Sequence, residues 1–571
     1  MIHSPRRRLA PLAGLLFALV ALLLPLTGPV SAAGPSFFVD GKHGSDANSG
    51  TSLGSAFKTI KAGLWALRYG GTLDVVGYTD YVYYETMTAS QWFANGSATS
   101  PISIRAYNYG SSGYVRPIVS GAKVVSRPGD GKWTRPNPTS YPDVWQTTWT
   151  TAIPGYESSV NGYHQERVFA DISQPLVRPA SFSLANLQAT PGSQWWDGSK
   201  LYVRLGGWGS TSGASLDPND HTIEIPFYTG LLVSSGSNYV QIMGFNVRHT
   251  TMGVGFTGTA SHDLVQDVDA SYNYTMGFFT ASSYNTFRRI TGSRNTIQLV
   301  KLDNGADHNL VEYATGTENM GQGVKLTGGG TQYNTVRWST FKGGKDVPTN
   351  QGGYGGYVQG VDIEQGANNN TIDGNTIQRN RRGLMLYQVN SSGGALSANT
   401  IKYNVFVGND DGVVLWDGKY TTAQGKGAVT FYRNVYDGNT KAVTAESYTS
   451  GKSFSQETYY NTGTVKTQSH STFYLKAGSI SVKDSIVYIS AGYNFYAASG
   501  AKLSVSYTTF IGTGIAFRNS ATTVPFGSGV LHLNPGFLSL DPASPDYLSI
   551  GKGSAGYTVS SSRGPVGARW R

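Results

Sequence analysis

The run NNTIDGNTIQRN, at residues 369–380, is one copy of a pattern that recurs between Asn273 and Trp416 and decides the fold. The runs of this kind begin at Asp263, Asn285, Asn309, Asn334, Asn370 and Asn399. Ten residues after these positions stand Asn273, Asn295, Asn319, Gly344, Asn380 and Asn409. In the last turns a middle set is added at Asn375, Asn404 and Asn434. A repeat of a few tens of residues with this fixed phase is the mark of a solenoid.

Each repeat contains short apolar alternations, such as Thr-Ile and Val-Phe-Val, which are interrupted by Gly and Asn. Such runs predict strands of a few residues joined by turns rather than helices. Asn suits the turns because it tolerates left-handed backbone and bonds to its own main chain. Identical Asn side chains stacked in register also form hydrogen-bonded ladders. The pattern therefore predicts an all-β chain folded as a parallel β-helix, with one coil per repeat.

The repeat also aligns one particular strand in every coil. The aligned segments are Gly253–Thr257, Gly277–Ala281, Leu299–Asp303, Gly323–Thr327, Gly360–Glu364, Gly383–Tyr387 and Gly412–Trp416. Their second and fourth residues are nearly always apolar, so these side chains are predicted to point into the coil and the third and fifth outward. Charge at the outward positions is confined to three successive coils, as Lys301, Asp303, Lys325, Asp362 and Glu364. We expect these side chains to face solvent, with Tyr387 and Trp416 on the following coils.

The composition of the 571 residues fits a turn-rich all-β chain, with 73 Gly and 36 Tyr. The absence of cysteine excludes disulfides and thiol chemistry. Arg6–Arg8 precede an apolar run over Leu9–Leu26 and a small-residue site at Val30–Ala33, which predicts a signal peptide over residues 1–33. We therefore expect a secreted protein that lacks a membrane segment after removal of this peptide. Removing the three arginines changes the net charge from +10 to +7.

The rest of the chain divides into four predicted parts. Residues 34–125 form an N-terminal cap with an amphipathic helix within 56–67 and the first coils, and 126–225 form a β-rich, Trp-rich insertion. Residues 226–514 form the main coil and 515–571 the C-terminal coil and cap. The insertion's tryptophans form either its own core or a sugar-binding wall. Two extra segments, 342–359 and 389–397, lie next to the charged strands and are predicted to wall a cleft.

Both ends of the mature chain carry a family resemblance. The segment FFVDGKHGSDANSGTSLGSAFKTIKAGLWAL, residues 37–67, is similar to the N-terminal signature of secreted right-handed parallel β-helix proteins of the pectate-lyase-like superfamily. Residues 533–570 resemble the closing segment of the same superfamily. The resemblance implies a right-handed parallel β-helix over nearly the whole mature chain. It does not define an activity, because function lies in sites that differ among proteins of one fold.

One reaction that suits the charged strands is β-elimination from a uronic-acid polymer, which needs a base and a cation. A lysine acts as the base if its pKa falls, and Lys301 beside Lys325 is expected to lower it, whereas Asp362 is expected to work against this lowering. Asp303, Asp362 and Glu364 are hard oxygen ligands of the kind that Ca²⁺ uses. The segment GQGVKLTGG, residues 321–329, resembles the strand that bears the catalytic lysine of family 9 pectate lyases, which implies that Lys325 is the base.

A second reaction is hydrolysis of a glycoside by two carboxylates. Asp303 and Glu364 are expected in one column two coils apart, about 9.6 Å at the usual strand spacing, which is near the upper limit for an inverting pair. The stretch Gly360–Gln388 resembles a β-helix glycosidase pattern in which Glu364 takes the Asp place and Tyr387 the Glu place. A third possibility is a non-catalytic glycan-binding or cell-surface protein whose charges form a solvated ion-pair ladder.

These alternatives share one set of candidate residues. Catalytic roles are assigned to Lys325, Asp362, Glu364 and Asp303, with the last three as candidate Ca²⁺ ligands. Substrate binding is assigned to Lys301, Tyr387, Trp416 and Arg382. A basic protein attracts an acidic polymer over long range, so the expected partner is an extracellular, acidic polysaccharide. No basic cluster points to nucleic acid, and we expect a monomer.

Overall fold

The structure is a computed structural model, and Gly34–Arg571 forms one compact unit within it. It describes residues 34–571 except 68–69, 87–94, 155–158, 161–162, 165–167, 172, 180, 207–214, 234–236, 348–357, 389–393, 422, 462–470, 490–492, 499–500, 513–516, 519–527, 533–536, 542–543, 558, 563–565 and 570–571. The predicted signal peptide over residues 1–33 thus lies outside the described residues. Within the described part, no helix has both the length and the apolar character needed to cross a membrane.

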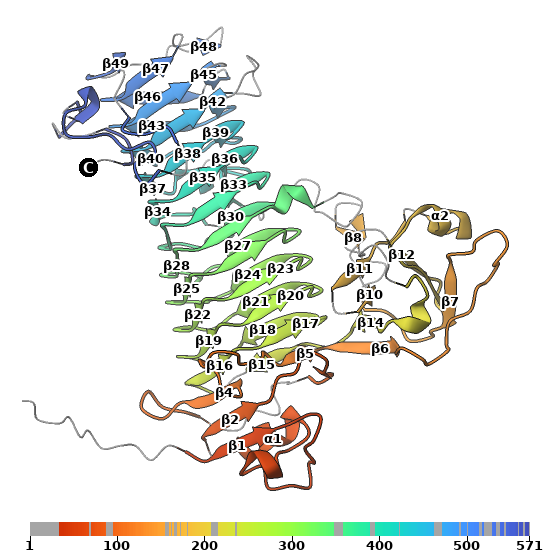
Figure 1. The fold of residues 1–571 in the computed structure, drawn as a ribbon. Coiled ribbons are helices and arrows are strands. Elements are labelled where there is room, and N and C mark those ends of the chain that lie inside the picture. Colours follow the sequence, from red (N-terminus) through yellow and green to blue (C-terminus); the bar gives the residue numbers. More distant parts are fainter. Residues whose placement is uncertain are drawn as a thin grey trace, which may run out of the picture. The chain divides into compact units, whose positions relative to one another are not determined.

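Three long parallel sheets build the solenoid (Figure 1), and from β16 to β48 each coil contributes one strand to each sheet in the order A, B, C. Sheet A consists of β1 (Ser36–Val39), β2 (Thr72–Val75), β4 (Ile102–Ala106), β16 (Val240–Met243), β19 (Leu264–Gln266), β22 (Thr286–Arg288), β25 (Leu310–Glu312), β28 (Thr335–Arg337), β31 (Thr371–Asp373), β34 (Asn399–Lys402), β37 (Val429–Tyr432), β40 (Lys452–Ser455), β43 (Ser479–Lys483) and β46 (Lys502–Ser506).

Sheet B consists of β3 (Val82–Tyr83), β5 (Ile118–Ser120), β17 (Asn246–Arg248), β20 (Asp269–Ser271), β23 (Thr291–Ser293), β26 (Thr315–Thr317), β29 (Thr340–Lys342), β32 (Thr376–Gln378), β35 (Val405–Val407), β38 (Val435–Asp437), β41 (Thr458–Asn461), β44 (Ile486–Ile489), β47 (Thr509–Gly512) and β49 (Leu531–His532). A two-residue turn connects most sheet A strands to the sheet B strand of the same coil, and the first of its residues has left-handed backbone.

Sheet C consists of β15 (Leu231–Val233), β18 (Met252–Phe256), β21 (Met276–Thr280), β24 (Gln298–Asp303), β27 (Gln322–Thr327), β30 (Gln359–Glu364), β33 (Arg382–Tyr387), β36 (Asp411–Trp416), β39 (Lys441–Ala445), β42 (Ser471–Leu475), β45 (Tyr493–Ala497) and β48 (Phe517–Arg518). The predicted parallel β-helix is confirmed, and it has the right hand that parallel crossover connections almost always take.

A short helix, α1 (Ile60–Ala66), lies at the N-terminal end of the solenoid, within the predicted range 56–67. The Thr59 hydroxyl caps it by accepting a hydrogen bond from the Ala62 amide. Gly63 faces the core so closely that an added Cβ would lie 2.6 Å from Leu73 Cδ1 and 2.8 Å from Val39 Cγ2. The helix thus packs against the first strands of sheet A, where an open solenoid end needs a cap.

The insertion is antiparallel, unlike the solenoid. Its elements are β6 (Ala122–Ser126), β7 (Trp145–Thr148), β8 (Ser159–Val160), β9 (Tyr163–His164), β10 (Val168–Ala170), β11 (Gln174–Leu176), α2 (Leu184–Ala189), β12 (Ser193–Trp196), β13 (Lys200–Arg204) and β14 (Ile223–Pro226). Trp133 and Trp145 are buried in its apolar core, and Trp149 and Trp196 pack against that core. These four tryptophans therefore belong to the insertion's own core and do not form an exposed wall; Trp208 lies outside the described residues.

The predicted asparagine ladders are present. In one ladder Asn375, Asn404 and Asn434 lie on successive coils, and each backbone N–H of Asn375 and Asn404 donates to the side-chain oxygen of the next residue. The Nδ2 of Asn404 also donates to Ile372 O at 2.9 Å and to Asn434 Oδ1 at 3.0 Å. The sets that begin at Asp263 and at Asn273 form ladders in the same way. These bonds satisfy polar groups at the bends of each coil, where sheet bonds end.

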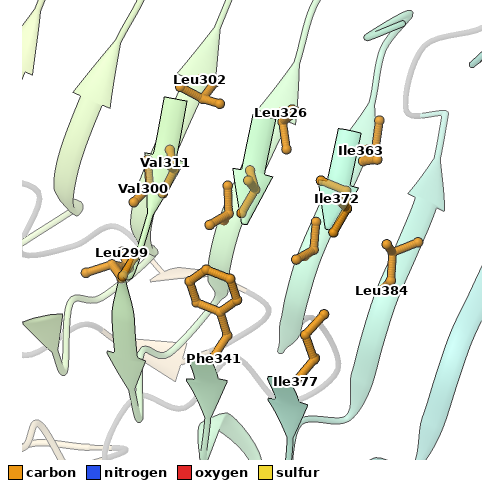
Figure 2. Packing of buried hydrophobic residues seen from close by; sticks show 14 of the residues in the cluster. Leu299, Val300, Leu302, Val311, Leu326, Phe341, Ile363, Ile372, Ile377 and Leu384 are labelled. Carbon is orange, nitrogen blue, oxygen red and sulfur yellow. The ribbon is translucent and has the colours of Figure 1, made fainter. Parts of the chain in front are cut away.

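Inside the ladders lies a continuous apolar core formed from all three sheets (Figure 2). In this view Val300, Leu302, Leu326, Ile363 and Leu384 of sheet C point toward side chains of the other two sheets. All five are fully buried, which confirms the inward half of the predicted alternation. Burial at about 25 cal/mol per Å² makes this core the main favourable contribution to stability.

Replacing Asn404 by Ala is expected to lower the free energy of unfolding by about 2 kcal/mol, because it leaves the buried groups that Asn404 now satisfies without partners. Urea unfolding measured by circular dichroism would test this. Thr430→Ala, at an exposed position of β37, serves as the control and should change stability little. An Asn404 variant as stable as the control would show that the ladder carries no net stability.

Candidate functional site

The candidate site lies on the outer face of sheet C, where β24, β27 and β30 run side by side. The register pairs Lys301 with Lys325 and Lys325 with Asp362. The same register places Thr327 between Asp303 and Glu364 in the neighbouring column. The column alignment predicted from the repeat is therefore confirmed, and five charged side chains share three adjacent strands.

The site holds two ion pairs. Lys325 Nζ contacts Glu364 Oε1, and the Thr327 hydroxyl donates to that same oxygen at 3.1 Å. Lys301 Nζ donates to Asp303 Oδ2 at 2.6 Å. Lys301 therefore forms its ion pair with a residue of its own strand. Glu364 contacts two residues of the preceding strand, Lys325 and Thr327. The ordering of these groups follows from the sheet register, since side chains opposite one another on parallel strands are neighbours.

Burial at the site differs from the prediction of a solvent-facing row. Asp362 and Glu364 are each only 2% exposed, and Met385 on the next strand is fully buried. The side chains of Lys301, Asp303 and Lys325 keep 22%, 16% and 19% exposure. The outer face of sheet C is therefore covered at β30 and β33 and partly open at β24 and β27. The predicted cleft walls fall partly outside the described residues, at 348–357 and 389–393.

The electrostatics of Asp362 are unusual. Burial, reinforced by the charge of Glu364, raises the pKa of the Asp362 carboxyl to about 8, although the positive charges of Lys325 and Arg382 oppose this. Its Oδ1 atom is buried without a hydrogen-bond partner among the described residues. A buried carboxyl without donors is more stable in its neutral form. Asp362 thus keeps its proton at neutral pH.

The lysine chemistry inferred from the sequence is corrected by the structure. Burial acts to lower the pKa of Lys325, but the negative charges of Asp362, Glu364 and Asp303 outweigh burial, so its pKa is raised. The expected lowering by Lys301 does not prevail, because the carboxylates lie in the same two columns. The raised pKa favours the ammonium form of Lys325, and the predicted role of this lysine as the base stays a prediction.

Asp303, Asp362 and Glu364 do not form a metal site in this structure. Among the described residues, no group of three or more His, Cys, Asp or Glu side chains is placed to hold a metal ion. The reason is local: Asp303 is paired with Lys301, and Glu364 is paired with Lys325. The suggested role of these three carboxylates as Ca²⁺ ligands stays a prediction.

The aromatic residues on the following strands form a small cluster outside the coil. Tyr387 and Trp416 lie with ring centroids 5.2 Å apart and pack with Met385 and Val414. Tyr387 is mostly buried, whereas Trp416 is partly exposed. Of the two rings predicted to stack on sugars, only that of Trp416 is well placed to do so. Arg382 donates to Met385 Sδ at 3.5 Å and lies at the start of β33.

Three residues of this face were missed by sequence reasoning. The exposed Lys419 donates to the Tyr387 hydroxyl at 3.0 Å and lies 5.1 Å from the Trp416 ring centroid. Further along sheet C, Tyr474 and Tyr496 stack at 4.8 Å in the column that continues from Lys325. The alternation in β42 and β45 could have predicted that the two tyrosines point outward. The asparagine repeat that aligned the earlier strands ends before them, so they were not placed in the column. Lys419 follows its strand in a turn that has no repeat position.

The sheets, ladders and core together define a right-handed parallel β-helix protein, the fold that the resemblance to the pectate-lyase-like superfamily implied. A family model described as periplasmic copper-binding protein (NosD) matches residues 246–478, which is less than half of the chain. No curated protein matches the sequence.

Several solved structures are similar to this chain. The complex of XylC with xylose has 11% identity and a TM-score of 0.49, and the match covers 88% of this chain and 86% of that chain. A protein described as a glycoside hydrolase has 11% identity and a TM-score of 0.43, with 87% and 96% covered. Pectate lyase Pel9A has 13% identity and a TM-score of 0.41, with 74% and 80% covered.

The histidines described in the family-matched segment do not suit copper. His249 is fully buried and its Nδ1 lies 2.6 Å from Glu224 Oε2. His262 and His308 are separated by Tyr284, and both stack on its ring. Copper sites gather several imidazole or sulfur ligands around one point, and the chain has no cysteine. The described residues of this segment therefore form no copper site.

Proposed function

We propose that the protein is an exported enzyme that hydrolyses an acidic polysaccharide, with Asp362 as the general acid and Glu364 as the general base. The observation that carries the proposal is the pair of carboxyl groups on β30. One is kept neutral by burial, and the other forms an ion pair with Lys325. Two carboxyl groups whose environments separate their protonation states are the arrangement that acid–base glycoside hydrolysis requires.

The spacing of the pair suits this reaction. Asp362 and Glu364 are two residues apart on one strand, and both side chains lie on its outer face. Two strand residues on one face are about 6.6 Å apart at the backbone, which is at the lower limit of the carboxyl separation in inverting enzymes. Asp362 would give its proton to the leaving glycosidic oxygen, and Glu364 would accept a proton from the attacking water; both steps require that these carboxyl groups, each 2% exposed, become accessible to the substrate.

Substrate recognition is assigned to the partly open side of the site. Lys301 and Lys325 lie side by side on β24 and β27, with partly exposed side chains. Two neighbouring ammonium groups attract the carboxylates of a uronic-acid polymer. The partly exposed ring of Trp416 provides an apolar face for a pyranose ring. Asp303 keeps Lys301 in place by the ion pair within β24.

Export is part of the proposal. It is supported by the signal-peptide pattern over residues 1–33 and by the periplasmic description of the family model that matches residues 246–478.

A second candidate function is β-elimination. The one observation that favours it is that Lys301 and Lys325 are neighbours on β24 and β27. With its raised pKa, Lys325 would stabilise the enolate that forms at the uronate instead of removing the proton. Another group would then have to act as the base. The two reactions give different products, because elimination leaves an unsaturated sugar that absorbs ultraviolet light whereas hydrolysis does not.

The test is a panel of pectin, alginate and glycosaminoglycans, with reducing ends and ultraviolet absorbance measured in parallel. Each assay is run with Ca²⁺ and with a chelator, because a Ca²⁺ requirement remains a prediction. New reducing ends without absorbance support hydrolysis. Absorbing products identify a lyase, and chelator sensitivity then assigns the cation. Binding without either product would show a non-catalytic glycan-binding protein.

A further inference from the structure

A second surface lies at the turns between sheets A and B and contains no residue of sheet C. Tyr313, Trp338 and Tyr403 occupy the turn position that follows β25, β28 and β34, and we call them the aromatic strip. They are 49%, 48% and 44% exposed. Exposed large aromatic residues gathered on one line are uncommon on a soluble protein and mark interaction sites.

Backbone hydrogen bonds show that the strip follows one column. Tyr313 N donates to Arg337 O, and Trp338 N donates to Asp373 O, each bond reaching the next coil. Gly374 N then donates to Lys402 O at 3.0 Å. Gly374 therefore occupies the same column between Trp338 and Tyr403. Along this column, two aromatic residues on successive coils are followed by a glycine and then by a third aromatic residue.

The backbone at this column makes aromatic residues costly. Tyr313, Trp338 and Tyr403 have φ of +54°, +50° and +56°, in the left-handed region. Gly374 has φ of +66° at the equivalent position and meets no such cost. Glycine or asparagine would satisfy the turn with less strain. Other bends of the solenoid share this backbone, for example at Tyr284 and Arg289, so the aromatic strip is distinguished by its exposed rings and their charged neighbours and not by its backbone.

Because the following coil has Gly374 at this position, one side of Trp338 has no neighbouring ring. On the preceding coil, the Tyr313 ring lies 5.2 Å away at an interplanar angle of 38°. On the following coil, a Cβ added to Gly374 would lie 2.9 Å from Trp338 Cδ1, so a larger residue would displace the indole. The next ring in the column is that of Tyr403, two coils away, or about 9.6 Å along the axis.

Cationic side chains accompany the strip. The Arg337 guanidinium lies 4.1 Å from the Trp338 ring centroid, and Arg433 lies 5.8 Å from the Tyr403 ring centroid. Lys402 also lies 5.8 Å from the Tyr403 ring. Two acids accompany these three cations: Glu312 pairs with Arg337, and Asp373 pairs with Lys402. Arg288 also binds Glu312, so the surface keeps an excess of positive charge.

We propose that the aromatic strip is a second, non-catalytic binding site for an acidic polysaccharide. The exposed parts of the Trp338 and Tyr403 rings pack on sugar rings, because aromatic surfaces attract apolar sugar faces. Arg337, Lys402 and Arg433 bind the carboxylates or sulfates of the chain, since arginine forks match such anions in geometry. The strip is independent of the chemistry at β30, so an enzyme and a pure binding protein would both use it.

The test measures affinity for polygalacturonate by isothermal titration calorimetry, with dextran as the neutral probe. The titrations use the full chain carrying Glu364→Gln, so that the polymer is not cleaved. Trp338→Asn and Tyr403→Asn are each expected to weaken binding about tenfold. Their melting temperatures should stay unchanged or rise, because asparagine suits left-handed backbone. This combination separates a binding role from a structural one, which would lower the melting temperature.

Tyr284→Asn is the matched control. Tyr284 is 50% exposed with φ of +61°, but His262 and His308 stack on it at 5.3 Å and 5.0 Å from either side. It therefore offers no open face, and its variant should bind like the parent. Unchanged affinity of Trp338→Asn, or equal binding of dextran and polygalacturonate, would overturn the proposal. Absence of cleavage by the unaltered protein would refute the proposed enzyme while leaving this binding result intact.

Discussion

Glu364→Gln and Asp362→Asn are each expected to lower the cleavage rate of the best polysaccharide about a hundredfold to ten-thousandfold, the usual contribution of a general acid or base. Glutamine cannot accept the proton of the attacking water, and asparagine has no proton of suitable acidity for the leaving oxygen. Initial rates of reducing-end release would measure both losses. Because burial raises the pKa of Asp362 to about 8, the rate of the unaltered enzyme should fall as pH rises through that value.

Asp411→Asn is a suitable control for this pair. Asp411 lies on β36 of the same sheet and accepts bonds from Lys441 at 3.2 Å and from Thr444. Its loss removes a paired carboxylate of the same face without touching β30, so activity should remain. An Asp362→Asn enzyme with full activity and an unchanged pH profile would remove the proposed acid.

Two substitutions of Lys325 distinguish hydrolysis from elimination further. Lys325→Arg keeps the positive charge beside Glu364, and a hydrolase should retain part of its activity. Lys325→Ala leaves Glu364 buried without its ion-pair partner and should inactivate either enzyme. Suppose that the products of the unaltered enzyme absorb ultraviolet light and that the arginine variant is as inactive as the alanine variant. The lysine itself would then take part in elimination.

The second large effect is expected from Asp263→Asn, which should raise the free energy of unfolding by about 5 kcal/mol at pH 8. Asp263 begins a ladder in which every later member is asparagine. It accepts a bond from Val240 N at 2.7 Å, but its Oδ2 is buried without a hydrogen-bond partner among the described residues. Burial raises its pKa to about 8, partly opposed by the Val240 amide.

The pH dependence gives the sign of this effect. The folded pKa of Asp263 lies above its usual value of 3.8, so the neutral form is the one that the fold favours. Its contribution to stability is complete below about pH 4 and is lost as pH rises toward 8. Asparagine cannot ionise, so the variant should gain most at pH 8 and least at pH 4. Chemical denaturation at both pH values would show this, and an equal gain at both would contradict the assignment.

The fold was predictable because its determinants repeat. The asparagines at each bend recur in fixed phase, and the strands between them are too short for any other regular structure. The alignment of Lys301, Lys325 and Asp362 followed from the same phase. The solenoid therefore required no long-range inference beyond stacking one repeat on the next.

The chemistry of the site was less predictable, because it depends on what covers the repeat. Alternation gave the outward direction of Asp362 and Glu364, but not their burial. The neighbouring carboxylates outweighed burial and reversed the expected direction of the Lys325 pKa, and no local pattern encodes that balance. The aromatic strip could not be predicted for a related reason. Its residues lie at turn positions, and the alternation along the strands carries no information about turns.

The ladders also determine how the protein responds to mechanical force. Each asparagine side chain joins its coil to the next, over separations of 22, 24, 25, 36 and 29 residues along the first ladder. A coil peeled from one end therefore breaks its ladder bonds and its three sheet pairings together, while the coil beneath keeps its own. Stretching a single molecule between its ends should then release chain in discrete lengths, and each length would be that of one repeat.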